Sequence, residues 1–97
     1  MTMRIERSNA FKRDYRRELK THGRSLGDIL DEALVMLIIE GKLPERYRNH
    51  KLSGAWGGMW ECHLKPDLLL LYEVISEDND DECLFLFRLG SHSKLFG

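Results

Sequence analysis

The sequence has few of the residues that mark secreted, disordered or membrane proteins. Two cysteines in 97 residues are too few for a disulfide framework, so we expect two reduced thiols in a cytosolic protein. Two prolines and eight glycines do not indicate disorder, and a hydrophobic content of 42% is enough for a core. The longest apolar runs, such as residues 33–39, are too short to span a bilayer, and no signal segment opens the chain. We therefore expect one cytoplasmic domain, residues 1–97, without membrane contact.

The net charge of −1 conceals an uneven distribution of charge along the chain. Between Met1 and Arg24, eight basic residues stand against three acidic ones, and between Gly41 and Pro66 five stand against two. Because local potential steers association, these basic segments can bind a polyanion despite the ordinary net charge. A simple solvated face explains the first of them equally well.

A short strand and two amphipathic helices are expected in the first half of the chain, at residues 3–7, 9–22 and 25–40. The apolar residues of the first helix recur every four positions: Phe11, Tyr15 and Leu19. The second helix is expected to open with a partial capping box that uses Asp28. Its core-facing residues follow helical spacing: Leu26, Ile29, Leu30, Ala33, Leu34, Leu37 and Ile38.

Three strands are expected in the second half, at residues 59–64, 68–75 and 83–89. The middle one, LLLLYEVI, is mostly apolar and typical of a central strand buried on both faces. Residues 44–53 are expected to form a polar loop, EDNDDE a hairpin loop and GSHSKLFG a tail. The order predicts an α+β fold, β-α-α-β-β-β, with an antiparallel sheet packed on the two helices.

Polar residues of the second half have the chemistry needed to cleave RNA. If the last three strands form a meander, His63, Asp67, Arg88 and His92 lie at one end of the sheet. Attack of a 2′-hydroxyl on the neighbouring phosphate needs a base and an acid, and imidazole suits both because its ordinary pKa lies near physiological pH. A fixed guanidinium stabilises the extra negative charge that forms. An aromatic residue such as Phe96 can stack on a splayed base.

The same residues also have structural explanations. A histidine at a strand end is most often structural, and Arg88 can pair with an acid such as Glu61 or Glu73. The two tryptophans are expected to pack rather than to hold bases. A metal site is disfavoured because no CxxC pair occurs and because Cys62 and His63, as strand neighbours, point to opposite faces. We therefore expect neither a metal nor a cofactor.

A run of short motifs between residues 43 and 97 matches a known family in register: LP, YRNH, LSGAW, ECH, PD, LLLLY and RLGSHSKLF. This half of the chain resembles the YafQ branch of the RelE-like bacterial toxins. The resemblance implies a compact RelE-like (microbial RNase-like) fold and a ribosome-dependent mRNA endoribonuclease that cuts the message in the ribosomal A site without metal. It also implies two partners, a cognate antitoxin that neutralises the toxin and the 70S ribosome with its mRNA.

The resemblance also implies a set of site residues. By position, the catalytic residues fall on His50, His63, Asp67, Arg88 and His92. His92 would be the general acid and Arg88 would stabilise the transition state, while the other three would share activation and orientation of the 2′-hydroxyl. Phe96 would hold a nucleotide, and Lys51 would contact RNA. Ribosomal RNA contacts are expected from basic residues of the first helix: Lys12, Arg13, Arg16, Arg17 and Lys20.

Two departures from the family and two other functions remain to be weighed. Leu68 stands where relatives usually carry tryptophan, and Gly57 stands where lysine is common. A non-enzymatic inhibitor of DNA gyrase, like the ParE-type toxins, would share the fold. A degenerate toxin would bind its antitoxin without cutting RNA. The histidine–arginine set favours the nuclease, because a pure binder has no need to assemble it.

Overall fold

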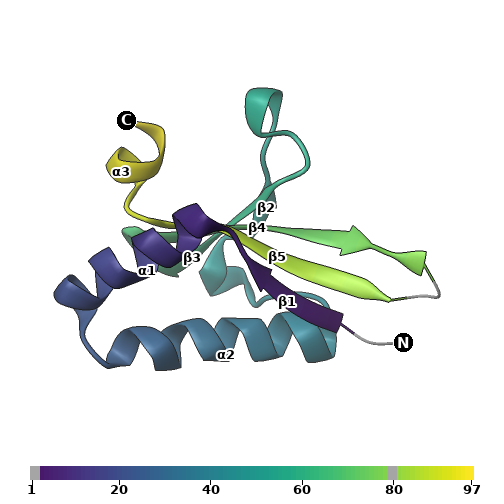
Figure 1. Cartoon of the computed structure of the whole chain (residues 1–97), viewed down its shortest axis with the longest axis horizontal. Helices are drawn as coiled ribbons and strands as arrows, with labels where there is room; N and C mark the ends of the chain where they lie inside the picture. The colour runs from purple at the N-terminus through teal and green to yellow at the C-terminus, as the bar shows by residue number, and fades with distance from the viewer. Residues whose placement is uncertain (1–2, 79–80) are drawn as a thin grey trace.

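The computed structural model describes residues 3–78 and 81–97. Its strands are β1 (Met3–Arg7), β2 (His50–Lys51), β3 (Trp60–Lys65), β4 (Leu68–Ser76) and β5 (Glu82–Gly90). Its α-helices are α1 (Asn9–His22), α2 (Ser25–Glu40) and α3 (His92–Phe96), and its 3-10 helices are η1 (Glu45–Tyr47) and η2 (Gly54–Trp56). Helices α1 and α2 lie on one side of the sheet, and α3 and η2 project from the other (Figure 1). The expected α+β fold on two N-terminal helices is confirmed.

The sheet is mixed, with the strand order β1-β5-β4-β3-β2. Strands β2 to β5 pair antiparallel in sequence order, as the expected meander requires. Strand β1 pairs parallel with β5, from Met3 opposite Glu82 to Arg7 opposite Leu86. This pairing was not expected. It becomes available because α1, α2 and the later strands carry the chain back to the starting edge of the sheet.

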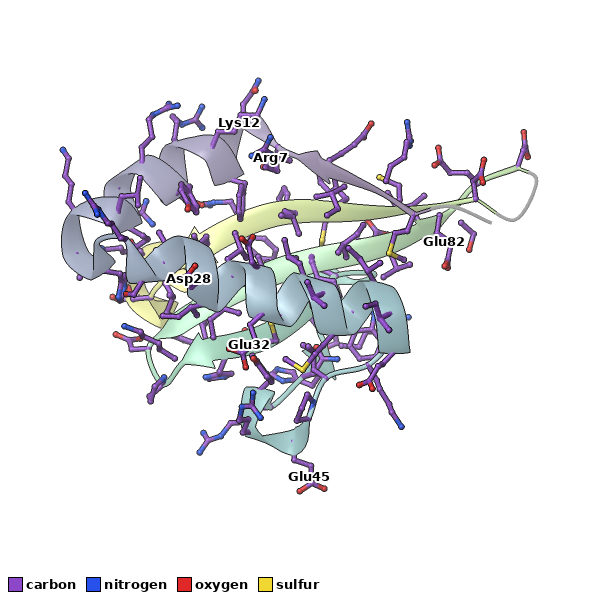
Figure 2. All side chains as sticks on the ribbon, turned by 90° about the horizontal axis from the view of Figure 1, so that it is seen from below. Arg7, Lys12, Asp28, Glu32, Glu45 and Glu82 are labelled. Atoms are coloured by element: carbon purple, nitrogen blue, oxygen red, sulfur yellow. The ribbon has the colours of Figure 1, made fainter. Side chains whose placement is uncertain are left out.

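The main core lies between the sheet and the two long helices. Phe11 of α1 and five residues of α2 pack there against β3, β4 and β5. Seen from that side, α2 lies across the sheet, with Asp28 and Glu32 on its outer face (Figure 2). Burial of β4 on both faces holds only for Leu68–Tyr72, because the next three residues are half-buried or exposed. The far end of β4 extends beyond the helices (Figure 1), which leaves Val74 and Ile75 each 39% exposed.

Helix α1 buries a different stripe from the expected one. Phe11 is buried, but Leu19 is 39% exposed, and the carboxylates of Asp14 and Glu18 are buried in its place. The helix begins as expected, since the Ser8 hydroxyl accepts a hydrogen bond from the Phe11 N–H at 2.9 Å. The error lies in assigning the inner face from apolar residues alone.

Helix α2 has the expected bounds but not the expected start. The residue before it, Arg24, makes no capping hydrogen bond, and the Ser25 hydroxyl donates to the His22 carbonyl at 2.8 Å. The capping box with Asp28 is therefore absent, since the hydroxyl that it needs bonds back to α1. Gly41 ends the helix in the left-handed conformation, at φ 72° and ψ 8°. Ile38 is 40% exposed rather than part of the core.

Three connections differ from the sequence interpretation or fall outside the structure. The loop expected at residues 44–53 contains η1 and β2, and the expected tail contains α3. The acidic connection at 77–82 includes residues 79 and 80, which lie outside the described residues. In the described part of the chain, no helix is both long and apolar enough to cross a membrane.

Side chains of Ser8 and of α1 continue the sheet where β1 ends. Beyond Arg7, the edge of β5 has no neighbouring strand. The Ser8 hydroxyl donates to the Phe87 carbonyl at 2.6 Å, and Asp14 accepts from the Leu89 N–H at 3.0 Å. Arg17 donates to the Leu89 carbonyl at 2.9 Å. These bonds satisfy backbone groups that would otherwise lie unpaired at the edge.

Candidate active site

Polar residues form a row across the face of the sheet that carries α3. His50 of β2 lies opposite Glu61 of β3, Glu61 lies opposite Leu71 of β4, and Leu71 lies opposite Arg88 of β5. Opposed residues of neighbouring strands share a face, so the four side chains start on the same side. A register shift leaves Phe87 as an extra residue in β5, which turns both Phe87 and Arg88 toward this side.

Glu61 joins His50 of this row to His63, which lies two residues further along β3 on the same face. Glu61 is 6% exposed, and its Oε1 lies 3.3 Å from Nε2 of His50 and 3.5 Å from Nε2 of His63. The buried carboxylate lies within ion-pair distance of two imidazoles, one on β2 and one on β3. The structure thus brings His50 and His63 together through an acid that sequence reasoning had not assigned to the site.

The ring nitrogens of both histidines face acceptors on both sides. Nδ1 of His50 lies 2.8 Å from the Arg48 carbonyl, and Nδ1 of His63 lies 3.3 Å from the Pro66 carbonyl. Because a carbonyl only accepts, these contacts favour a proton on each Nδ1. The other ring nitrogen of each histidine, Nε2, faces the Glu61 carboxylate. Two imidazoles around one acid are groups that acid–base chemistry can use.

The second part of the site is α3 and its contact with the β3–β4 turn. The His92 N–H donates to Oδ1 of Asp67 at 3.3 Å, so the expected approach of these two residues is confirmed. The His92 ring centroid lies 5.0 Å from that of Phe96, which lies 5.4 Å from that of Trp56. Trp56 packs against aromatic neighbours, as expected for a structural tryptophan. Leu95, 7% exposed, anchors α3 on the sheet.

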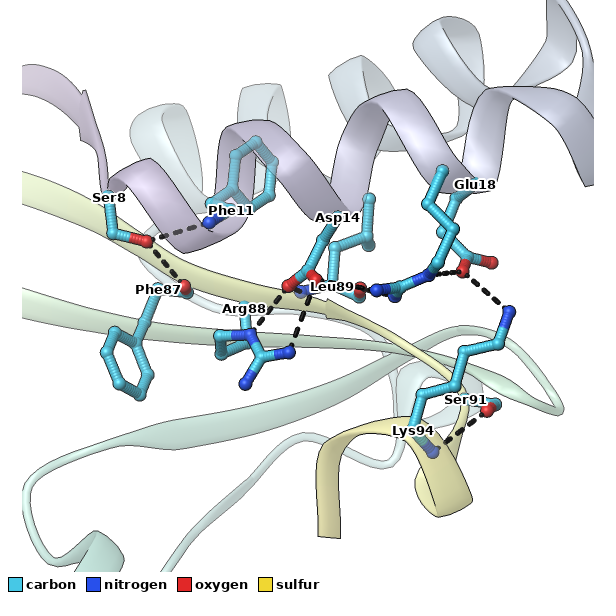
Figure 3. Close-up of polar contacts among 10 residues, drawn as sticks. Ser8, Phe11, Asp14, Glu18, Phe87, Arg88, Leu89, Ser91 and Lys94 are labelled. Carbon is cyan, nitrogen blue, oxygen red and sulfur yellow. Dashed lines mark hydrogen bonds and ion pairs between the residues drawn. The ribbon is translucent and has the colours of Figure 1, made fainter. Parts of the chain in front are cut away.

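Arg88 pairs with an acid that was not considered. Its Nε donates to Oδ2 of Asp14 at 2.7 Å and its Nη2 to Oδ1 at 3.2 Å. Asp14 also accepts from Arg17 at 2.9 Å (Figure 3). The expected partners Glu61 and Glu73 are therefore wrong: Arg88 lies next to the β5 edge, where α1 delivers Asp14.

The buried carboxylate pair, Asp14 and Glu18, stays ionised. Burial alone would raise the pKa of Asp14, but hydrogen bonds from Arg88 and the Leu89 N–H outweigh it, and the pKa lies below its ordinary value. Burial opposes ionisation of Glu18 too, yet hydrogen bonds from Arg17 and Lys94 lower its pKa. Lys94 belongs to α3, and its Nζ lies 3.1 Å from Glu18. One face of α1 thus holds both Arg88 and α3.

Most of the expected RNA contacts are accessible, with one exception. Lys51 is exposed on β2, and so are four basic residues of α1: Lys12, Arg13, Arg16 and Lys20. Arg17 is instead held by Asp14, Glu18 and the Leu89 carbonyl.

A cleft of about 320 Å³ also opens beside His63. Three of its lining residues are basic: Arg46, Arg48 and Lys65.

Comparison with known proteins decides the family. The family model described as "Bacterial toxin of type II toxin-antitoxin system, YafQ" matches residues 3–97. The chain belongs to the YafQ family of bacterial toxins. The resemblance seen in residues 43–97 is confirmed and extends through the N-terminal strand and helices, where the motifs were weaker.

Individual YafQ proteins agree with this assignment. The mRNA interferase toxin YafQ of Escherichia coli K12 is 32% identical over 95 residues, which cover 96% of this chain and 95% of that protein. A putative YafQ toxin of Haemophilus influenzae is 44% identical over 52 residues, so this match spans about half of each chain, 54% and 50%. In structure, YafQ in the E. coli DinJ-YafQ toxin-antitoxin complex superposes with a TM-score of 0.80, at 31% identity and 100% coverage of both chains.

Sequence reasoning missed three acids of this YafQ site: Asp14, Glu18 and Glu61. A signal for two of them was present, because Phe11, Asp14 and Glu18 have the spacing of one helix face. Acids on such a face indicate buried cationic partners.

Cys62 lies in the helix-side core while His63 faces the site. Within residues 3–78 and 81–97, no group of three or more His, Cys, Asp or Glu residues is suited to hold a metal ion.

Proposed function

We propose that this YafQ-family toxin is a ribosome-dependent mRNA endoribonuclease, an mRNA interferase. The observation that carries the proposal is the pair of acid–base groups on one face of the sheet. One is Glu61 with its two histidines, and the other is Asp67 with His92. The name of the E. coli relative, mRNA interferase toxin, supports the same substrate. Because this substrate is mRNA under translation, we infer that the toxin acts in the cytoplasm.

In the proposed reaction, the 2′-hydroxyl attacks its own 3′ phosphate and the 5′-oxygen leaves. His50 and His63 share removal of the hydroxyl proton, with Glu61 orienting both rings and balancing the charge that either acquires. His92 donates a proton to the leaving oxygen, and Asp67 fixes the start of α3 and thereby the place of His92. The product is a 2′,3′-cyclic phosphate, and no metal takes part.

Charge and stacking complete the proposed substrate site. Arg88 stabilises the additional negative charge of the phosphorane, because a fixed guanidinium in a partly dry site needs no reorganisation. Phe96 stacks on a base of the RNA, and its edge-to-face contact with Trp56 holds its ring in place. Lys51 and the exposed basic residues of α1 contact the phosphates of ribosomal RNA. The affinity of the toxin for the ribosome therefore falls as the salt concentration rises. Arg17 is left out of this set because each of its three guanidinium nitrogens already donates a hydrogen bond within the protein.

The proposal includes an antitoxin. The E. coli relative was solved in a complex titled DinJ-YafQ toxin-antitoxin complex. By the same pairing, we infer that this toxin is held inactive by a cognate antitoxin. The test below therefore uses toxin freed of antitoxin.

The test is primer extension on a reporter mRNA in a cell-free translation reaction. Wild type is compared with His92→Ala, with Ser93→Ala as a control on the exposed side of the same helix, and with the same mRNA without ribosomes. We expect cuts only with ribosomes, lost in His92→Ala and kept in Ser93→Ala. Intact message with wild type would overturn the nuclease, and a gyrase supercoiling assay would follow. Cuts that persist in His92→Ala would assign the acid to another residue.

A further inference from the structure

The contacts of Asp14 exceed what a stable helix–sheet contact needs. Its side chain is 4% exposed, and the carboxylate accepts four hydrogen bonds, two from Arg88, one from Arg17 and one from the Leu89 N–H. The bonds to the Leu89 N–H and Arg17 explain why an acid is present at the β5 edge. They do not explain the two-point grip on Arg88, whose side chain is 25% exposed and has access to water.

The geometry of that grip leaves part of Arg88 available. Asp14 binds Nε and Nη2, which lie on one edge of the guanidinium. Among the described residues, 3–78 and 81–97, Nη1 has no hydrogen-bond partner. Figure 3 shows this third nitrogen pointing away from Asp14. A bidentate carboxylate fixes the plane of a guanidinium, so the two N–H groups of the free nitrogen point in fixed directions.

Asp14 is itself held rigidly. Arg17 binds it from one side and continues to Glu18 and to the Leu89 carbonyl. Gly90 makes room for this arrangement, because a Cβ there would lie 2.6 Å from Nη2 of Arg17. Asp14 is thus closed off from water and tied to three residues by four hydrogen bonds, which restricts its movement.

We propose that Asp14 is a positioning residue for Arg88, which it orients toward the scissile phosphate without touching RNA. This inference rests on the proposed nuclease function. Because a charge-stabilising group works in the transition state only when its direction is fixed beforehand, loss of Asp14 lowers kcat rather than ribosome binding. Because Asp14 holds the guanidinium of Arg88 in one orientation, the remaining N–H groups of Arg88 donate in defined directions. Without Asp14, Arg88 would be a mobile cation on the surface.

The test is a double-mutant cycle on cleavage of ribosome-bound mRNA. Wild type, Asp14→Asn, Arg88→Ala and the double variant are compared, with Asp28→Asn as a matched control at an exposed position on α2. We expect Asp14→Asn to lower kcat about ten- to a hundredfold, with KM changed less than about twofold. In the Arg88→Ala background the same substitution should change kcat less than about twofold, because the residue acts only through Arg88.

Each other outcome counts against a specific claim. A wild type that does not cut overturns the proposed function itself. A wild type that cuts, with Asp14→Asn equally active, overturns the positioning role alone. Equal losses from Asp14→Asn with and without Arg88 would mean that Asp14 merely supports the fold.

A second measurement applies to the wild-type protein, in case Asp14→Asn is unfolded at the assay temperature. The Arg88 side-chain Nε–H is followed by 15N NMR of the free toxin. A grip by Asp14 predicts one downfield signal that exchanges slowly with water, since charge-assisted hydrogen bonds are short and strong. Arg13 and Arg16, which are exposed on α1, serve as the reference. An Arg88 signal that exchanges with water as fast as theirs would show that Arg88 is not held and would overturn the proposal.

Discussion

Replacement of Glu18 by glutamine isolates the contribution of one buried charge. The Glu18 side chain is 4% exposed and accepts from Arg17 at 2.9 Å and from Lys94 at 3.1 Å. Removing one partner of a buried pair typically costs about 3–5 kcal/mol because the other charge is left unpaired. Here Lys94 is 44% exposed and has access to water, and Arg17 keeps Asp14 as a partner. We therefore expect a loss of about 2 kcal/mol in the free energy of unfolding.

The pH dependence of that loss has a definite sign. The pKa of Glu18 is lowered in the folded protein, with 4.5 as its ordinary value. The stability gained from the ionised carboxylate is thus complete above about pH 4.5 and is lost as the pH falls through the lower folded-state pKa. The difference between wild type and Glu18→Gln should be largest at neutral pH and should shrink in acid, because wild-type Glu18 then becomes neutral as well.

Urea unfolding followed by tryptophan fluorescence measures this difference at neutral and acid pH. The matched control is Glu32→Gln, since Glu32 pairs with Arg46 at the same 2.9 Å distance but with both side chains about 60% exposed. The control should stay within about 0.5 kcal/mol of wild type. A Glu18→Gln loss below that value at neutral pH would refute the reasoning. So would a loss of equal size at both pH values, since the charge would then not be its source.

Three further predictions concern the packing of α3 on the sheet, the edge of β5 and the core. Leu95→Ala should cost about 2 kcal/mol in urea unfolding and abolish cleavage while the fold persists, because α3 carries His92; full activity would contradict this. Gly90→Ala should move Arg17 off the Leu89 carbonyl and cost about 1–3 kcal/mol, and unchanged stability would show that the edge tolerates a Cβ. Cys62, whose pKa burial raises to about 12, should resist thiol reagents at mildly alkaline pH until urea unfolds the protein; rapid labelling of the native state would disagree.

The fold was largely predictable because its signals are local. Periodicity and glycine placed α2 within a residue of its observed ends, and the apolar run of β4 identified the centre of the sheet. Strand β2 and helix α3 were missed for a physical reason. A two-residue strand and a five-residue helix are too short to carry a period, and both are stabilised by tertiary contacts rather than by propensity. The parallel pairing of β1 depends on chain return, which no local pattern encodes.

The candidate site was predictable in part. The meander alone brings Asp67 to His92, so connectivity was sufficient for that contact. The partner of Arg88 was not predictable in the same way, because Asp14 is 74 residues away in sequence and reaches the strand from a helix. Its clue was the helical spacing that places Asp14 and Glu18 on one face with the apolar Phe11. Sequence reasoning assigned the inner face to Phe11, Tyr15 and Leu19 instead.

The two faces of the sheet divide the work of an enzyme that acts inside a larger particle. One face is closed by two long helices and holds most of the core, while η2 and α3 project from the other (Figure 1). Reactive groups on the open face can approach RNA without a deep pocket, and Glu61 and Asp67 position some of them. The buried carboxylate pair fixes further groups from the helix side of the sheet. Asp14 holds Arg88, and Glu18 holds Lys94 of α3, at one helical turn from each other. In this proposal, α1 therefore serves two functions, with exposed cations for ribosomal RNA and buried acids for the site.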